Sequence, residues 1–301
     1  MTYITTFRHA LRGALVPALV AIALSQGGTA LAQDDPGHFS VEVSGEGSDV
    51  IFIPGLSTPR DVWDATAEHL GEGYRIHLVQ VRGFGEHAGA NAEGPILQPM
   101  VGELATYIEE HELEHPALVG HSLGGLISLM LAAEHPDMPG KLLVVDALPW
   151  FGAIFGNGAA SVETMESQAA MMRDMLKAQA GTPMPPQALA ATARSQALEE
   201  ESREAVASYI ARADPRVTGQ LLYEDITTDM REDVALITAP ITVLVPFAPP
   251  AVTEESALQL YSGEYAAAQD VTIRTVGPAG HFLMLDQKEA FLAELDAFLE
   301  R

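Results

Sequence analysis

The strongest chemical signal in the sequence is Gly120-His121-Ser122-Leu123-Gly124-Gly125, a G-x-S-x-G pattern. It follows the apolar residues 117–119 and precedes an apolar run over 126–133, so the spacing predicts a strand, a sharp turn and a helix, with Ser122 at the apex. Glycines leave room for a strained backbone at the serine. The following helix would point its amides and its positive dipole end at a developing oxyanion. A phosphate-binding glycine loop would need a lysine that is absent here.

A serine hydroxyl is a weak nucleophile and needs a base. The chain has ten histidines, of which His281 has the most informative setting. It follows an apolar run over 271–276 and the loop 277–280, and it precedes an amphipathic segment over 288–299. A loop after the last strand of a parallel sheet lies at the carboxyl edge, where Ser122 is also expected. The chain has no cysteine, which excludes disulfides, thiolate metal sites and a cysteine nucleophile.

A second motif, His111-Glu112-Leu113-Glu114-His115, matches the H-E-x-x-H pattern of zinc proteases. That chemistry requires both histidines on one continuous helix. Pro116 follows directly and biases His115 away from helical geometry. The segment is therefore interpreted as a solvated helix end. For the protein as a whole we expect neither a metal nor an organic cofactor.

Short apolar runs alternate with longer amphipathic stretches from about residue 39 onward. This alternation predicts an α/β fold with a mostly parallel sheet flanked by helices. The predicted strands cover residues 39–43, 50–53, 76–81, 117–120, 142–146, 241–245 and 271–276.

Almost ninety residues separate the predicted strands ending at 146 and beginning at 241, which is too long for one crossover helix. Helical patterns over 162–178, 186–197 and 199–211 predict a helical cap or lid inserted at one edge of the sheet. We therefore divide the chain into a targeting segment (1–32), a first core part (33–148), the cap (149–233) and a second core part (234–301).

The motifs together resemble the α/β-hydrolase superfamily, from about Asp49 to the C-terminus. The resemblance rests on the segments 53–57 (Ile-Pro-Gly-Leu-Ser), 81–85 (Val-Arg-Gly-Phe-Gly), 120–125 and 280–282 (Gly-His-Phe), in the family's order. It implies that Ser122 is the nucleophile and His281 the general base. It also implies an oxyanion hole formed by the backbone amides of Leu56 and Leu123.

The third member of the triad departs from the family's commonest pattern. Many relatives carry an aspartate after the strand that precedes the histidine strand, but here residues 246–250 (Pro-Phe-Ala-Pro-Pro) contain no carboxylate. The alternative position in the superfamily is the end of the strand after the nucleophile helix, where Asp146 stands. We assign Asp146 as the acid that would orient His281. Glu254, Glu255 and Asp286 remain the alternatives.

Residues 1–32 have the layout of a secretory signal peptide. Arg8 and Arg12 precede or open an apolar run over 11–24, and Ala30-Leu31-Ala32 is a small-x-small cleavage pattern. The run is shorter than the roughly 20 residues that span a bilayer. We expect cleavage near Ala32 and a mature protein that is periplasmic or secreted, without stable membrane association.

Acidic residues outnumber lysine and arginine by 41 to 16, giving a formal net charge of -25, so nucleic acid is a poor candidate partner. Trp150, Phe151, Met171 and Met175 are expected to line an apolar substrate cleft. The prediction is a secreted serine hydrolase that cleaves carboxylic esters of small apolar substrates. The alternatives are a lactonase, a C-C bond hydrolase or an acyltransferase on the same triad, or a relative that binds a ligand without turnover.

Overall fold

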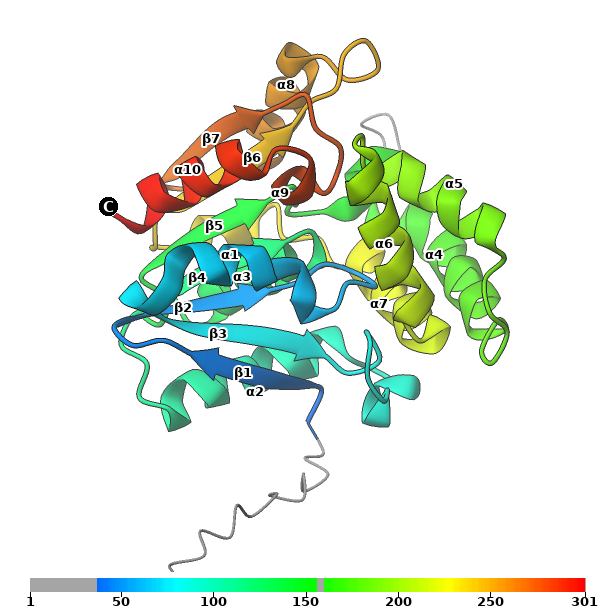
Figure 1. The fold of residues 1–301 in the computed structure, drawn as a ribbon, viewed down its shortest axis with the longest axis horizontal. Coiled ribbons are helices and arrows are strands. Elements are labelled where there is room, and N and C mark those ends of the chain that lie inside the picture. Colours follow the sequence, from blue (N-terminus) through cyan, green and yellow to red (C-terminus); the bar gives the residue numbers. More distant parts are fainter. Residues whose placement is uncertain (1–36, 156–159, 301) are drawn as a thin grey trace, which may run out of the picture. The chain divides into compact units, whose positions relative to one another are not determined.

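The protein is described by a computed structural model that covers residues 37–155 and 160–300. The predicted signal peptide lies outside the described residues. One sheet organises the described residues (Figure 1), and its strands are β1 (Phe39–Ser44), β2 (Ser48–Ile53), β3 (Tyr74–Val81), β4 (Ala117–His121), β5 (Lys141–Val145), β6 (Ile241–Pro246) and β7 (Val271–Val276).

The strands lie in the order β1-β3-β2-β4-β5-β6-β7. Only the edge strand β1 is antiparallel to its neighbour, and every other pairing is parallel. The carboxyl ends of β2, β4, β5, β6 and β7 therefore lie along one edge of the sheet, where open α/β folds place their ligand sites. The central strand β4 is buried at every position, as expected for a strand covered on both faces.

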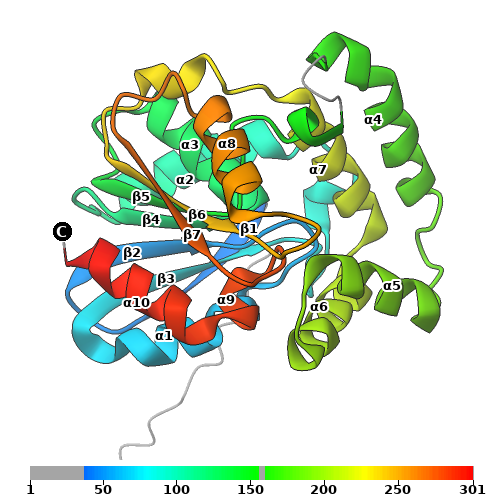
Figure 2. The same cartoon turned by 90° about the horizontal axis from the view of Figure 1, so that it is seen from above.

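Helices cover both faces of the sheet (Figure 2). One face packs against α2, α3 and α8, and the other against α1 and α10. The helix α3 is buried along almost its whole length, which explains why its sequence is apolar all round. These core helices are α1 (Asp64–Leu70), α2 (Leu97–Glu110), α3 (Leu123–Glu134), α8 (Glu254–Glu264), α9 (Leu283–Asp286) and α10 (Lys288–Leu299). Short 3-10 helices cover Arg60–Trp63, Gly71–Gly73, Gly89–Ala92, Phe151–Phe155 and Asp233–Leu236.

The segment between β5 and β6 folds into further helices that stand at the carboxyl edge of the sheet (Figure 1). We call these helices the cap, and they are α4 (Val162–Lys177), α5 (Pro186–Gln196), α6 (Glu200–Arg212) and α7 (Pro215–Thr227). Capping residues mark the starts of two of these helices. At the start of α4, Ser161 forms a capping box with Thr164, and at the start of α7, the Asp214 side chain accepts a hydrogen bond from the Arg216 amide and Pro215 is the first helical residue. A small apolar cluster holds α4 against α7 through Met165, Ala169 and Ile226.

The predicted fold class is confirmed, and each predicted strand is present with its ends shifted by at most two residues. The helix α7 was not predicted as a helix, although it lies within the predicted cap. None of the described helices is both long and apolar enough to span a bilayer.

Asp286 links the cap to the core. Its buried carboxylate accepts hydrogen bonds from the backbone amides of Leu198 and Glu199, which connect α5 to α6, and from the amide of Gly280 at 2.8 Å. A carboxylate with several amide donors is a strong and localised link. It ties the entry of α6 to the loop that carries His281.

Replacing Asp286 by Asn tests this link. The amide group keeps the shape but loses the charge and presents a donor to backbone N–H groups, so we expect a loss of about 1–3 kcal/mol in the free energy of unfolding. Urea denaturation measures it. Asp296→Asn is the matched control because Asp296 is an exposed acid paired with His69, and its change should stay within about 0.5 kcal/mol. Equal stabilities for the two variants would contradict the proposed link.

Candidate active site

Ser122 occupies the turn between β4 and α3, as its sequence pattern predicts. Its backbone has φ 52° and ψ -122°, a conformation that side chains other than glycine rarely adopt. The turn is held on both sides: the Ser122 amide donates to the Val145 carbonyl at 2.9 Å, and the Ser122 carbonyl accepts from the Gly125 amide at 2.7 Å. The strained serine is therefore supported by neighbouring backbone.

Gly124 is required by a close approach of backbone. A Cβ atom at this position would lie 2.2 Å from the Ile53 carbonyl oxygen and 2.8 Å from that of Pro54. The first turn of α3 thus packs directly against the end of β2. No larger residue fits without moving the strand or the helix.

The loop after β2 passes beside Ser122. A Cβ atom on Gly55 would lie 2.8 Å from Nδ1 of His121 and 3.1 Å from Cβ of Ser122. The backbone amide of the next residue, Leu56, which is bonded to Gly55, therefore lies close to Ser122. Leu123 is the first residue of α3, so its amide has no helical carbonyl one turn earlier to bond.

Asp146 and His281 form the closest polar pair of the site. Nδ1 of His281 lies 2.6 Å from Oδ2 of Asp146. The carboxylate accepts a hydrogen bond from Nδ1–H. The neutral ring therefore keeps its proton on Nδ1, and the unprotonated Nε2 is able to act as a base. Asp146 follows β5 with φ 47°, and its amide donates to the Leu244 carbonyl at 2.9 Å.

The other candidate acids are engaged elsewhere. Asp286 is held by the backbone amides described above. Glu254 accepts from the Thr275 hydroxyl at 2.6 Å, and Glu255 is exposed on α8. Of the four carboxylates considered from the sequence, Asp146 is the one beside His281.

Tyr261 is a partner of Asp146 that the sequence did not indicate. From α8, its hydroxyl donates to Oδ1 of Asp146, the oxygen that His281 does not use. Burial, and next the Asp146 carboxylate, hold the pKa of Tyr261 well above its ordinary value, so the hydroxyl keeps the proton that it donates. Both carboxylate oxygens of Asp146 are thus occupied.

His121, next to the serine, is fully buried. Its Nε2 lies 3.0 Å from the carbonyl oxygen of His281, and the two rings have centroids 4.6 Å apart. Burial, followed by the nearby His281, keeps the pKa of His121 well below its ordinary value. The ring is therefore neutral and donates from Nε2 to the backbone of His281.

Ser122, Asp146 and His281 line one cavity of about 210 Å³. Its remaining walls combine apolar side chains with two further polar ones, and they are formed by Leu126, Ala147, Leu148, Phe151, Ile154, Asp225 and Tyr261. The three residues expected to carry the chemistry therefore face a common space beneath the cap.

Comparison with known proteins identifies the family of the chain. The profile of the Alpha/beta hydrolase family matches residues 50–294. The chain belongs to the alpha/beta hydrolase family. It is 34% identical over 112 residues to the pimeloyl-(acyl-carrier protein) methyl ester esterase of Vibrio cholerae serotype O1, a match that spans 37% of this chain and 42% of that relative.

Solved structures share the fold of this alpha/beta hydrolase. An esterase from Exiguobacterium antarcticum superimposes with a TM-score of 0.70 at 18% identity, covering 87% of this chain and 96% of the esterase. The enol-lactonase from Burkholderia xenovorans LB400 gives a TM-score of 0.69 at 16% identity, with coverages of 87% and 96%. At these identities the likeness concerns the fold alone.

The expected cavity lining is only partly correct for this family member. Phe151 lines the cavity, as predicted. Trp150 does not, because its ring is buried in the apolar cluster with Met165, Ala169 and Ile226, where Nε1 donates to the Ile226 carbonyl at 2.8 Å.

The expectation for Met171 and Met175 is wrong. These side chains are 64% and 61% exposed. The inner face of α4 is formed by Met165, Ala169 and Met172, spaced one helical turn apart. Met171 and Met175 lie outside this face, on the exposed flank of the helix.

The H-E-x-x-H segment lacks the geometry of a zinc helix. The helix α2 ends at Glu110, and His111 and His115 follow it with Glu112 and His115 at positive φ. No group of three potential metal-ligating side chains of His, Cys, Asp or Glu occurs among the residues that the structure describes.

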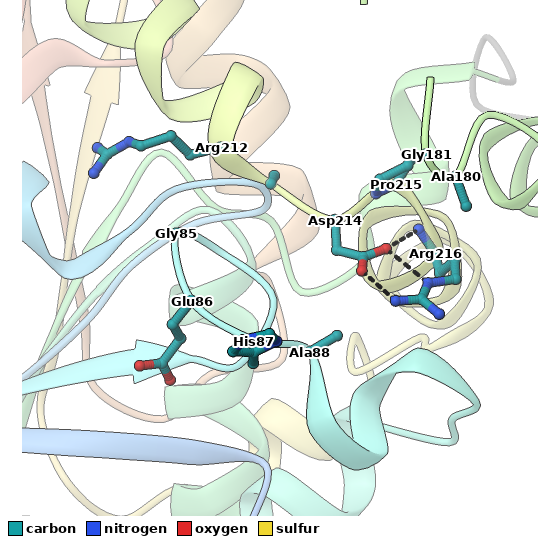
Figure 3. Close-up of a pocket in the computed structure, with 11 residues that line it drawn as sticks. Gly85, Glu86, His87, Ala88, Ala180, Gly181, Arg212, Asp214, Pro215 and Arg216 are labelled. Carbon is teal, nitrogen blue, oxygen red and sulfur yellow. Dashed lines mark hydrogen bonds and ion pairs between the residues drawn. The ribbon is translucent and has the colours of Figure 1, made fainter. Parts of the chain in front are cut away.

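A larger cavity of about 720 Å³ lies between the loop 85–88 and the start of α7 (Figure 3). Three of its charged groups, Arg212, Asp214 and Arg216, are in ion pairs, and Glu86 accepts a hydrogen bond from the Ser40 hydroxyl at 3.3 Å. Asp214 accepts from the amide and the guanidinium of Arg216, and Arg212 points away toward Asp61 at 2.7 Å. Ser122 and His281 do not line it, so the candidate catalytic residues meet in the smaller cavity.

The neutral state of His121 can be tested directly. Because burial disfavours the charged ring, we expect no titration of the His121 ring between about pH 5 and about pH 8. Histidine NMR over this range measures it, with the His121 signals assigned from a His121→Gln spectrum. A titration midpoint within the range would contradict the neutral assignment.

Proposed function

We propose that this alpha/beta hydrolase is a serine hydrolase that cleaves carboxylic esters through an acyl-enzyme on Ser122. The observation that carries the proposal is the 2.6 Å contact between Asp146 and His281 in the cavity that Ser122 lines. The name of the Vibrio cholerae relative, a methyl ester esterase, supports the same reaction class.

Each residue has a defined role in the proposed reaction. Ser122 attacks the ester carbonyl while Nε2 of His281 takes the hydroxyl proton, and His281 then gives that proton to the leaving alcohol. Asp146 holds the imidazole in the required tautomer and stabilises the imidazolium. The amides of Leu56 and Leu123 donate to the oxyanion, and water releases the acid by the same route.

The cavity suggests the size and character of the substrate. Leu126, Leu148, Phe151 and Ile154 supply apolar walls. The volume of about 210 Å³ is below the roughly 300–1,000 Å³ of pockets for drug-sized ligands. We therefore propose small-molecule esters with a short apolar arm as the substrates.

Export is part of the proposal. The arginine, apolar and small-residue pattern of residues 1–32 supports secretion to the periplasm or the medium with cleavage near Ala32. N-terminal sequencing of the mature protein after expression in a bacterial host tests it. An intact N-terminus at Met1 would refute export by cleavage.

The first test is hydrolysis of p-nitrophenyl esters of increasing acyl length by the mature protein. We expect turnover with the best rate at short chains, and a loss of at least ~10⁴-fold in kcat for Ser122→Ala. The variant should keep the thermal unfolding midpoint of the wild type. Full activity in Ser122→Ala would remove the nucleophile assignment. Binding without turnover by the folded wild type would favour a ligand-binding relative.

The acid is tested separately. Asp146→Asn should lower kcat by about 10⁴-fold, because the amide no longer selects the reactive tautomer of His281. Glu254→Gln and Asp286→Asn are controls at the other candidate acids, and their kcat should remain within about 10-fold of wild type. The opposite ranking would show that another carboxylate serves His281.

A further inference from the structure

Asp225 is a buried acid in the candidate cavity that the proposed reaction does not use. It lies near the end of the cap helix α7, is 6% exposed, and lines the cavity that contains Ser122 and His281. Among the described residues, none donates a hydrogen bond to its carboxyl group or forms an ion pair with it. The polar group therefore reaches the cavity without a protein partner.

In this respect Asp225 differs from Asp286 and Asp146. Asp286, the other aspartate with comparable burial, accepts from three backbone amides. Asp146 has His281 and Tyr261 as donors. Buried polar groups nearly always have partners, and those without one point to a functional requirement.

Apart from the Ser122 hydroxyl and Nε2 of His281, which the proposed reaction uses, Asp225 is the polar side chain of the cavity lining that is free to meet a ligand. Asp146, Tyr261 and His281 are bonded to one another, and the other walls are mainly apolar. Burial raises the pKa of Asp225 to about 7, with His281 acting in the opposite direction. Even the protonated carboxyl retains a carbonyl oxygen that accepts hydrogen bonds.

We propose that Asp225 determines specificity by accepting a hydrogen bond from a donor group, a hydroxyl or an ammonium, carried on the otherwise apolar arm of the substrate. The inference rests on the proposed function of this cavity and deepens it. A site with a buried acceptor discriminates against analogues that lack the donor, because the acceptor is then left unpaired. The substrate class is thus a short ester with one polar donor on its arm.

Matched ester pairs test the proposal. Each pair has one chain length and differs by a hydroxyl or an amino group, placed at successive positions of the acyl chain in one series and of the alcohol in another. We expect the wild type to prefer one donor-bearing member by about 10- to 100-fold in kcat/KM. The series that shows the preference tells whether the donor lies on the acyl or the alcohol part, and the preferred substituent tells whether it is a hydroxyl or an ammonium.

The variant Asp225→Leu removes the acceptor while keeping the side-chain size similar. It should lose the preference, measured as the ratio of kcat/KM within each pair for the same variant. It should also raise the thermal unfolding midpoint at about pH 8, where the buried acid would otherwise ionise. Asp174→Asn changes an exposed cap acid paired with Arg173 and should leave both the preference and the unfolding midpoint unchanged.

The outcomes separate this inference from the proposed function. Turnover of unsubstituted esters with no preference in any pair, or an equal preference in Asp225→Leu, overturns the role of Asp225 and leaves the esterase intact. If no ester is turned over, calorimetric binding of the same pairs to Ser122→Ala with and without Asp225→Leu decides the matter. Tighter binding of the donor-bearing member only when Asp225 is present supports the inference, and equal binding refutes it.

Discussion

The backbone contact between the first turn of α3 and the end of β2 is the constraint on which the rest of the site depends. With no side chain at Gly124, the helix approaches the Ile53 and Pro54 carbonyls closely enough to fix the height of Ser122 above the sheet. The same contact brings the loop at Gly55 against Ser122. The positive φ of Ser122 is sustained by bonds to Val145 and Gly125. This one backbone contact therefore determines the positions of both Ser122 and the proposed oxyanion donors.

The position of the acid follows from sheet topology. The strands β4, β5 and β6 are parallel neighbours, so an acid after β5 and an acid after β6 both stand near a histidine that follows β7. Here the loop after β6 has no carboxylate, and Asp146 after β5 reaches His281 instead. Tyr261 from α8 takes the second oxygen. Two donors on one carboxylate limit its rotation, which is what an orienting acid needs.

The parts of this site that follow from local patterns were predictable from the sequence, and the parts that depend on helix rotation and tertiary packing were not. The strands and the turn at Ser122 are encoded by apolar runs and by glycines at fixed offsets, and both were predicted correctly. The sequence favoured Asp146 as the acid and left three other carboxylates as alternatives. Of these four, Asp146 is the one that contacts His281, at 2.6 Å. Met171 and Met175 share a periodicity with the true inner residues Met165 and Met172, so the pattern alone could not tell which side of α4 faces inward. Asp225 and Tyr261 are single polar residues on helices, and nothing nearby in the sequence marks them.

Asp146 and Asp225 are two carboxyl groups in one cavity with different hydrogen-bonding environments. Asp146 follows a core strand and accepts hydrogen bonds from two donors, which fix its orientation. Asp225 lies on the cap with no protein donor, and burial raises its pKa to about 7. The residues proposed for the chemistry come from the core, whereas the residue proposed for specificity comes from α7. The helix α7 packs against α4 through the apolar cluster of the cap and also against the core, because Val217 and Leu221 belong to the main core cluster. Its Thr218 hydroxyl lies 2.8 Å from the hydroxyl of Ser57 in the loop after β2. The proposed choice of substrate and the proposed reaction thus use residues of different elements, which core packing brings to one cavity.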